Sequence, residues 1–247
     1  MTYCVGVLLN DGVVLASDSR THAGIDNIAT FCKMTVFEQP GDRVIVLLSS
    51  GNLAGTQSVI SVLQQRGESQ DGKASVWNAR TMFDVAGVVS DAVRDVERRD
   101  GPSLAQTPHP FNASFIIGGQ IAGEPPRLFR TFAEGNFIEA GADTPFFQTG
   151  ETKYGKPIID RVITQATGLG DAMKCILVSF DSTMRSNLSV GMPIDLVCCE
   201  RDALRLGERH RFGPDDDYFR DLGKEWRDGV RDVFRRLPGV PSRPARD

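Results

Sequence analysis

The chain has 247 residues, of which 24% are charged and 40% hydrophobic, and its formal net charge at pH 7 is −4. This composition is close to that of an average soluble globular protein, and the length allows one large domain. The acidic balance provides no basic field for a nucleic-acid backbone. The longest aliphatic run, Val44–Leu48, is far shorter than the ~20 apolar residues of a membrane span. We therefore expect neither nucleic acid nor a membrane as a partner.

The N-terminal segment and the cysteines favour a cytoplasmic protein. No basic leader opens the chain, and Asp11 interrupts the first apolar stretch, so no signal peptide is expected. The five cysteines are odd in number and lack a C-x-x-C spacing, which favours buried free thiols. The histidines, His22, His109 and His210, stand far apart, and no metal site is expected.

Two pairs of strands are predicted at the start of the chain. Residues 3–20 resemble a hairpin, because two apolar runs flank Asn10-Asp11-Gly12, a sequence suited to a tight turn. Residues 31–38 and 43–49 form a second pair around a turn that contains Pro40 and Gly41. Four strands should therefore precede the first helix.

Groups of helices and strands follow one another in the rest of the chain. They are predicted as helices over 53–65 and 75–98, strands over 111–119, 128–133 and 137–140, two helices within 150–182 divided at 168–170, and a last strand over 189–199. Runs of strands followed by runs of helices are typical of an α+β fold. We expect two antiparallel sheets stacked between two helix layers, which is a four-layer αββα sandwich.

Residues 215–237 are predicted to form an amphipathic helix near the end of the chain. Its apolar residues recur at steps of three and four while charges fill the other faces; they are Tyr218, Leu222, Trp226, Val230, Val233 and Leu237. Such a face needs a surface to pack on, either in the same chain or in a neighbouring subunit. We expect one domain over 1–207 and, over 208–247, a helical extension with a proline-rich tail.

One short motif resembles a phosphate-binding loop. Gly150–Lys156 fits the pattern G-x-x-x-x-G-K, but Pro157 stands where Ser or Thr would hold magnesium. Proline also removes an N–H group that would contact phosphate. We interpret this segment as the start of a helix with proline in its first turn.

Thr2 is the candidate nucleophile of this chain. The G-x-S-x-G, S-x-x-K and H-E-x-x-H signatures of other hydrolases are absent from the sequence. We expect Met1 to be removed, since the second residue is small, which leaves Thr2 with a hydroxyl group and a free α-amine. An α-amine has a pKa of about 7.7–8.0 and can accept the hydroxyl proton near neutral pH. One residue would then be both nucleophile and base.

The context of Thr2 contains several motifs that match a known family. They are the segment Gly12–Gly24, Lys33, Ser49-Ser50-Gly51, Thr149-Gly150 and Arg185–Gly191. With them the chain resembles, over roughly 1–200, the proteasome β-subunit family of N-terminal nucleophile hydrolases. Within that family, residues 148–161 and the charged C-terminal helix are most similar to Anbu, the bacterial "ancestral β-subunit" group.

The resemblance implies a threonine-type peptide or amide hydrolase that acts as a homo-oligomer and needs no cofactor. Thr2 Oγ would attack the carbonyl carbon, and its α-amine would carry the proton. Lys33 would lower the pKa of the Thr2 α-amine through its charge, and Asp18 would orient Lys33. His22 stands where the family usually has a threonine that pairs with the substrate backbone; a plain sheet-edge histidine is the alternative.

Three more residues complete the implied site. The N–H group of Gly51 would stabilise the oxyanion, and Thr149 and Ser189 would support the α-amine. The aspartate that usually supports the nucleophile is replaced by Ser186. Either that carboxylate is missing, or Asp181 substitutes for it from another direction.

Two other functions remain open at this point. The same Thr2 chemistry would serve an amidase or an acyl-transfer enzyme that acts on a small metabolite. A scaffold subunit with little turnover is the non-enzymatic alternative, and the joint presence of Thr2, Asp18 and Lys33 argues against it.

Overall fold

The structure is a computed structural model that describes residues 2–22, 28–68, 72–107 and 110–241. The chain divides into two units, residues 1–214 and 215–247.

The first sheet of residues 1–214 has the strand order β10-β1-β2-β11-β12. Its strands are β10 (Phe146–Gly150), β1 (Tyr3–Leu9), β2 (Gly12–Asp18), β11 (Ile194–Glu200) and β12 (Arg209–Phe212). All of its strand pairs are antiparallel. The predicted hairpin is confirmed, because Leu9 pairs with Gly12 around the two turn residues Asn10 and Asp11.

The second sheet has the order β5-β6-β7-β8-β9 and is also antiparallel. Its strands are β5 (Met34–Gln39), β6 (Arg43–Gly51), β7 (Ala113–Ile121), β8 (Arg127–Thr131) and β9 (Phe137–Glu139). A separate two-stranded sheet contains β3 (Arg20–His22) and β4 (Ile28–Thr30).

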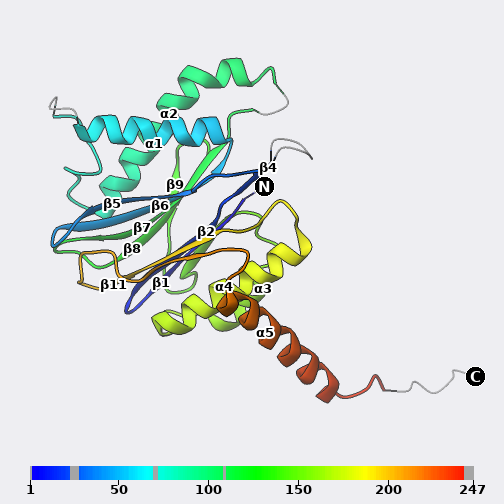
Figure 1. Cartoon of the computed structure of the whole chain (residues 1–247). Coiled ribbons are helices and arrows are strands. Elements are labelled where there is room, and N and C mark those ends of the chain that lie inside the picture. Colours follow the sequence, from blue (N-terminus) through cyan, green and yellow to red (C-terminus); the bar gives the residue numbers. More distant parts are fainter. Residues whose placement is uncertain (1, 23–27, 69–71, 108–109, 242–247) are drawn as a thin grey trace, which may run out of the picture. The chain divides into compact units, whose positions relative to one another are not determined.

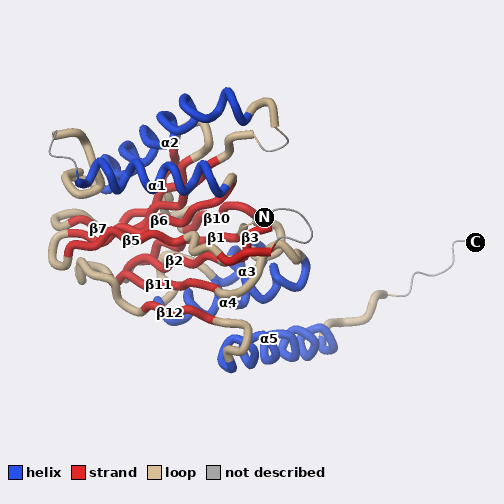
Figure 2. The backbone as a smooth tube through the Cα atoms, turned by 45° about the horizontal axis from the view of Figure 1, so that its top comes forward, coloured by secondary structure: helices blue, strands red, loops and turns tan. Residues whose placement is uncertain are grey.

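The two large sheets are stacked and are covered by helices on their outer faces (Figures 1 and 2). Helices α1 (Leu53–Glu68) and α2 (Met82–Leu104) cover the second sheet, and α3 (Lys156–Val162) and α4 (Leu169–Ser186) cover the first. Buried apolar side chains fill the space between the sheets, among them Leu15, Leu48, Ile116 and Leu128. The expected αββα sandwich is therefore confirmed.

Several predicted boundaries around the second helix pair are wrong. The segment from residue 150 is not helical throughout, because β10 runs to Gly150 and α3 begins only at Lys156. Gly155 precedes α3 and Pro157 lies in its first turn, which agrees with our interpretation of this segment as a helix start. The strand predicted from Ser189 begins at Ile194, and β12 follows it.

The prediction for α2 is wrong at both ends. Residues 75–78 form a turn in which the Ser75 N–H donates to Asn78 Oδ1 at 2.8 Å. The helix begins after Thr81, whose hydroxyl accepts the Asp84 N–H while the Asp84 carboxylate accepts the Thr81 N–H. It extends past the predicted end to Leu104, with Pro102 in its last turn.

Residues 215–247 contain the amphipathic helix α5 (Asp217–Arg236), as predicted. Asp216 caps its N-terminus by accepting the Phe219 N–H at 2.9 Å. Acidic and basic side chains pair along the helix at a spacing of three residues, as between Asp232 and Arg235. Its exposed apolar side chains are Tyr218, Trp226, Val230, Val233, Phe234 and Leu237.

The described residues hold no membrane-spanning helix and no cluster of three potential metal ligands. Cys4, Cys175, Cys198 and Cys199 are buried free thiols, but Cys32 is exposed, which corrects the expectation that all five are buried. Burial raises the pKa of Cys175 and of Cys198 to about 11 and that of Cys199 to about 12.

Candidate active site

Thr2 lies at the start of β1 and is partly buried. Its carbonyl oxygen accepts the Glu151 N–H at 2.6 Å, and the next N–H, that of Tyr3, donates to Asp18 Oδ1 at 3.0 Å. The backbone on the C-terminal side of Thr2, where β1 begins, is thus hydrogen-bonded to the end of β10 on one side and to the end of β2 on the other. A nucleophile at this position is fixed by the sheet rather than free at a chain end.

Tyr3 anchors this end of β1 to helix α4. Its side chain is fully buried, and its hydroxyl accepts the Gln148 Nε2–H at 2.6 Å and shares a hydrogen bond with Ser179 Oγ at 3.0 Å. Its ring packs on that of Phe180, with 4.6 Å between the centroids. Burial raises the pKa of the Tyr3 phenol, so the hydroxyl stays neutral.

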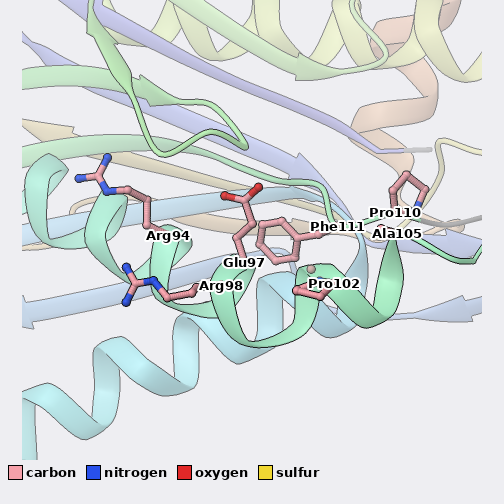
Figure 3. A pocket seen from close by; sticks show the side chains of 8 residues that line it. Arg94, Glu97, Arg98, Pro102, Ala105, Pro110 and Phe111 are labelled. Carbon is pink, nitrogen blue, oxygen red and sulfur yellow. The ribbon is translucent and has the colours of Figure 1, made fainter.

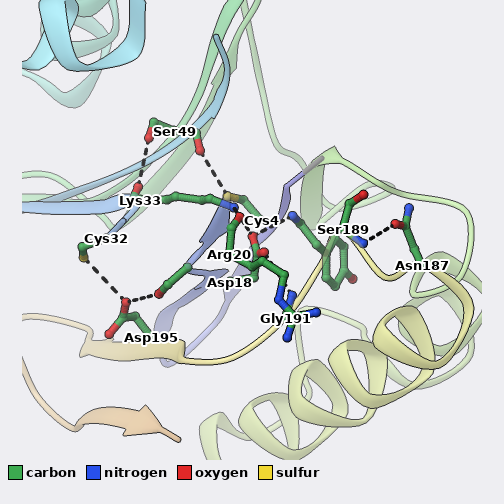
Figure 4. Close-up of polar contacts among 12 residues, drawn as sticks. Cys4, Asp18, Arg20, Cys32, Lys33, Ser49, Asn187, Ser189, Gly191 and Asp195 are labelled. Atoms are coloured by element: carbon green, nitrogen blue, oxygen red, sulfur yellow. Dashed lines mark hydrogen bonds and ion pairs between the residues drawn. The ribbon is translucent and has the colours of Figure 1, made fainter. Parts of the chain in front are cut away.

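Asp18 and Lys33 form a buried ion pair directly beside this strand end (Figure 4). Lys33 Nζ donates to Asp18 Oδ1 at 2.6 Å and to the Arg20 carbonyl at 2.7 Å. Asp18 Oδ2 accepts the Gly191 N–H at 3.3 Å. Burial raises the pKa of the Asp18 carboxyl group, while the charge of Lys33 and the N–H groups of Tyr3 and Gly191 act against this rise.

Gly51 ends β6 with a backbone conformation that favours glycine. Its φ is +116°, and a Cβ atom there would overlap the carbonyl group of Asn112. The Asn112 carbonyl accepts the Asn52 N–H at 2.7 Å, which keeps the two chain segments in close contact. Any residue larger than glycine would push them apart at the predicted oxyanion position.

Thr149 and Ser189, the two residues predicted to support the α-amine, make different contacts. The hydroxyl of Thr149 shares a hydrogen bond of 2.7 Å with that of Ser50, which links β10 to β6 and so connects the two sheets. The backbone N–H of Ser189 donates to Asn187 Oδ1 at 2.9 Å. Figure 4 shows Asn187, Ser189 and Gly191 on the loop that follows α4.

The sequence left two alternatives for the carboxylate that supports the nucleophile: it is missing, with Ser186 in its place, or Asp181 substitutes for it. Asp181 accepts Arg185 Nε at 2.9 Å on α4, and Ser186 is the last residue of that helix. Glu151 lies beside Thr2 instead, and its Oε2 accepts Asn187 Nδ2 at 2.9 Å. Neither Glu151 nor Asn187 was predicted from the sequence, although Glu151 directly follows the motif residues Thr149-Gly150.

The histidines are the remaining polar residues that the sequence analysis considered. His210 is on β12 with Nε2 2.9 Å from Glu208 Oε2, His22 is on β3, and His109 lies outside the described residues. A pocket beside the C-terminal half of α2 is lined by Arg94, Glu97, Arg98, Pro102, Pro110 and Phe111, among others (Figure 3). None of the predicted site residues lines it.

Known structures with the same fold cover nearly the whole chain. An Anbu (Gly-1) mutant from Hyphomicrobium sp. strain MC1 is 50% identical, with a TM-score of 0.92, and the match covers 98% of this chain and 100% of that one. The helical assembly of the Anbu complex from Pseudomonas aeruginosa is 51% identical, with a TM-score of 0.91, over 98% and 99% of the two chains. The chain belongs to the Anbu family.

More distant similarity extends to proteasomes. Proteasome subunit beta 1 of Thermococcus gammatolerans is 24% identical to the Anbu chain over 209 residues, which are 83% of this chain and 92% of that protein. No family model matches the sequence. The resemblance inferred from the motifs is confirmed, and the group around Thr2 lies in a proteasome-type fold.

Proposed function

We propose that this Anbu chain is a threonine-type hydrolase of peptide or amide bonds, with Thr2 as the nucleophile once Met1 has been removed. The observation that carries the proposal is the position of Asp18, which accepts both the Tyr3 N–H and the Lys33 ammonium group. A cation is thereby held at the start of the strand that presents Thr2. Its charge favours the neutral form of a nearby α-amine, which is the form that can act as a base.

The proposed reaction has two steps. Thr2 Oγ bonds to the carbonyl carbon while the α-amine takes the hydroxyl proton, and the oxyanion accepts the Gly51 N–H, a contact of the kind worth about 3–4 kcal/mol. The C–N bond then breaks, and the leaving amine takes the proton. Water hydrolyses the resulting ester with the α-amine again as base, which releases the acid and restores Thr2. Thr149 and Ser189 would support the α-amine, and the chemistry requires no cofactor.

A covalent probe tests this proposal without knowledge of the natural substrate. A peptide epoxyketone bonds to both the hydroxyl and the α-amine of an N-terminal threonine. We expect intact-mass analysis to show loss of Met1 and one added probe on the wild type, none on Thr2→Ala, and labelling retained on Thr2→Ser. Retained Met1 on the purified protein would overturn the mechanism, because the α-amine would lie in a peptide bond.

The substrate class is tested by comparing peptides with small amides. Hydrolysis of a fluorogenic peptide library by the wild type but not by Thr2→Ala would support a peptidase. Turnover of small amides alone would favour the metabolite amidase. If Met1 is lost and no carbonyl substrate or probe acylates Thr2, the scaffold function gains support instead.

We further propose that the chain acts in the cytoplasm as a homo-oligomer, with residues 1–207 as the catalytic domain and 208–247 as the extension used in assembly. The exposed apolar residues of α5 support this proposal, because such a contiguous face marks an interaction surface. The relative from Pseudomonas aeruginosa forms a helical assembly. Light scattering after size exclusion should show an oligomer for the wild type and smaller species for Val233→Asp/Phe234→Asp, whereas Arg231→Gln should leave the mass unchanged.

A further inference from the structure

Glu151 is the residue that faces Thr2 across the sheet. Tyr3 pairs with Gly150, so the next residues of the two antiparallel strands, Thr2 and Glu151, stand opposite each other. The Glu151 N–H donates to the Thr2 carbonyl at 2.6 Å. Gly150 permits this close approach, because its φ is +83° and a Cβ atom there would overlap the Thr2 carbonyl group.

The direction of the backbone places the nitrogen of Thr2 on the side of Glu151. Along an extended strand, the N–H and C=O groups of one residue point to the same side, and those of the next residue point to the other. The Tyr3 N–H points to Asp18 on the side of β2, and the Thr2 carbonyl points to Glu151 on the side of β10. The α-amine that processing would create at Thr2 therefore lies on the side of Glu151.

The carboxylate of Glu151 is buried, and its partners among the described residues are neutral donors. Glu151 is 8% exposed, its Oε1 accepts the Lys153 N–H at 3.0 Å, and its Oε2 accepts Asn187 Nδ2 at 2.9 Å. Within the described ranges, no Lys or Arg side chain forms an ion pair with it. A buried carboxylate is costly without a cationic partner.

A short loop connects this carboxylate with Asp18 on the other side of Thr2. Asn187 donates to Glu151 and accepts the Ser189 N–H at 2.9 Å, and Gly191 donates to Asp18 at 3.3 Å. Arg20 Nη1 donates to the carbonyl of Leu188 on the same loop at 2.9 Å. This loop therefore contacts Asp18, the partner of Lys33, and Arg20 at the end of β2 and start of β3, and Glu151 at the end of β10.

We infer that Glu151 is a positioning residue that holds the α-amine of mature Thr2 and supplies its anionic partner. The inference rests on the proposed function, since it needs Thr2 to carry a free α-amine. Glu151 favours the ammonium form, whereas Lys33 favours the neutral amine. The balance of the two charges would keep the pKa of the α-amine close to neutral pH, and the carboxylate would hold its nitrogen on the side of β10.

The test is a direct titration of the α-amine in protein whose N-terminus is shown by intact mass to be Thr2. The amines are ¹³C-methylated, and the shift of the Thr2 signal is followed by NMR against pH. Relative to the wild type, Glu151→Gln is expected to lower the pKa of the α-amine by about one unit. Glu151→Asp, which keeps the charge, should restore most of the difference.

Asp181→Asn is the matched control, because it removes a carboxylate that pairs with Arg185 on α4. It should leave the pKa of the α-amine unchanged. If Glu151→Gln does not melt cooperatively, Glu151→Ser replaces it with the same expected fall. A folded Glu151 variant without the charge but with the wild-type pKa would overturn the inference.

This readout separates the inference from the proposed function. The titration reports on the α-amine whether or not any substrate is cleaved, whereas the epoxyketone experiment reports on covalent modification of Thr2. If the pKa of the α-amine falls in Glu151→Gln but no probe modifies Thr2 in the wild type, the role of Glu151 is supported and hydrolysis is not. In an active enzyme, the acid limb of the pH profile for acylation should also move to lower pH in Glu151→Gln.

Discussion

Lys33 Nζ lies 2.6 Å from Asp18 Oδ1, and both side chains are buried. Removal of one partner from a buried ion pair leaves an uncompensated charge and typically costs about 3–5 kcal/mol. We expect Asp18→Asn and Lys33→Met each to lower the free energy of unfolding by an amount of this order. The double variant should be more stable than either single variant, as measured by urea denaturation of all four proteins. Strict additivity of the two losses would show that the groups do not interact.

Gly150 is expected to tolerate no side chain. Gly150→Ala places a Cβ against the Thr2 carbonyl group at a φ of +83°, and strain of this kind costs about 1–3 kcal/mol. Thermal melting should show the loss of stability, and labelling of Thr2 by the epoxyketone should fall with it. Gly87→Ala in α2 is the control, because nothing lies within 4 Å of its Cβ position; it should gain about 0.5–1 kcal/mol. Equal effects at the two positions would contradict the proposed contact.

The hydroxyl pair of Ser50 and Thr149 is expected to couple the two sheets. Thr149→Val leaves the buried Ser50 hydroxyl without the partner that lies at 2.7 Å, which should cost about 1–3 kcal/mol. Ser50→Ala/Thr149→Val removes both hydroxyls and should cost less than the sum of the single changes. A double-mutant cycle by chemical denaturation measures this coupling, and a value near zero would count against a hydrogen bond between the sheets.

Alkaline pH is expected to destabilise the protein through its buried thiols. The pKa of Cys199 is raised from 9.0 to about 12, so above pH 9 the unfolded chain releases a proton that the folded chain retains. The stabilising contribution is complete below pH 9 and declines as pH rises towards 12, by about 1.4 kcal/mol per pH unit.

Comparison of variants isolates this effect from other titrating groups. Urea denaturation at pH 8.5, 9.5 and 10.5 should show a shallower decline for Cys199→Ala than for the wild type. Val197→Ala, which shortens a buried side chain of the same strand and removes no titrating group, should keep the wild-type slope. A Cys199→Ala variant with the wild-type slope would contradict the predicted linkage.

The parts of the fold that were predictable are those with a strong local pattern. The first hairpin has two apolar runs around a turn sequence, and α5 has apolar residues at helical steps. The strand β10 was missed because Phe146–Gly150 is short and ends in glycine; its extended form comes from pairing with β1. The strand β12 carries three charged or polar residues in Arg209-His210-Arg211, so local pattern gave no sign of it.

Residues of the candidate site were predictable only where the sequence contains a motif of the proteasome β-subunit family. The resemblance named Asp18 and Lys33, which lie 15 residues apart in sequence and in contact in space. It did not name Glu151, because the role of this residue depends on β10, the strand that was missed. The alternatives that the resemblance left, Ser186 without a carboxylate or Asp181, both lie on α4.

The burial of Tyr3 has a consequence for the timing of maturation. Its ring, hydroxyl and N–H are all held inside the folded sheet, so Thr2 is the last residue before the chain enters the core. An aminopeptidase has to bind the residues that follow the bond it cuts, and in the folded protein the Thr2 carbonyl and the Tyr3 N–H are already hydrogen-bonded to Glu151 and Asp18. We expect Met1 to be cleaved during synthesis, before β1 joins the sheet; a chain that folds first would keep its methionine for as long as it stays folded.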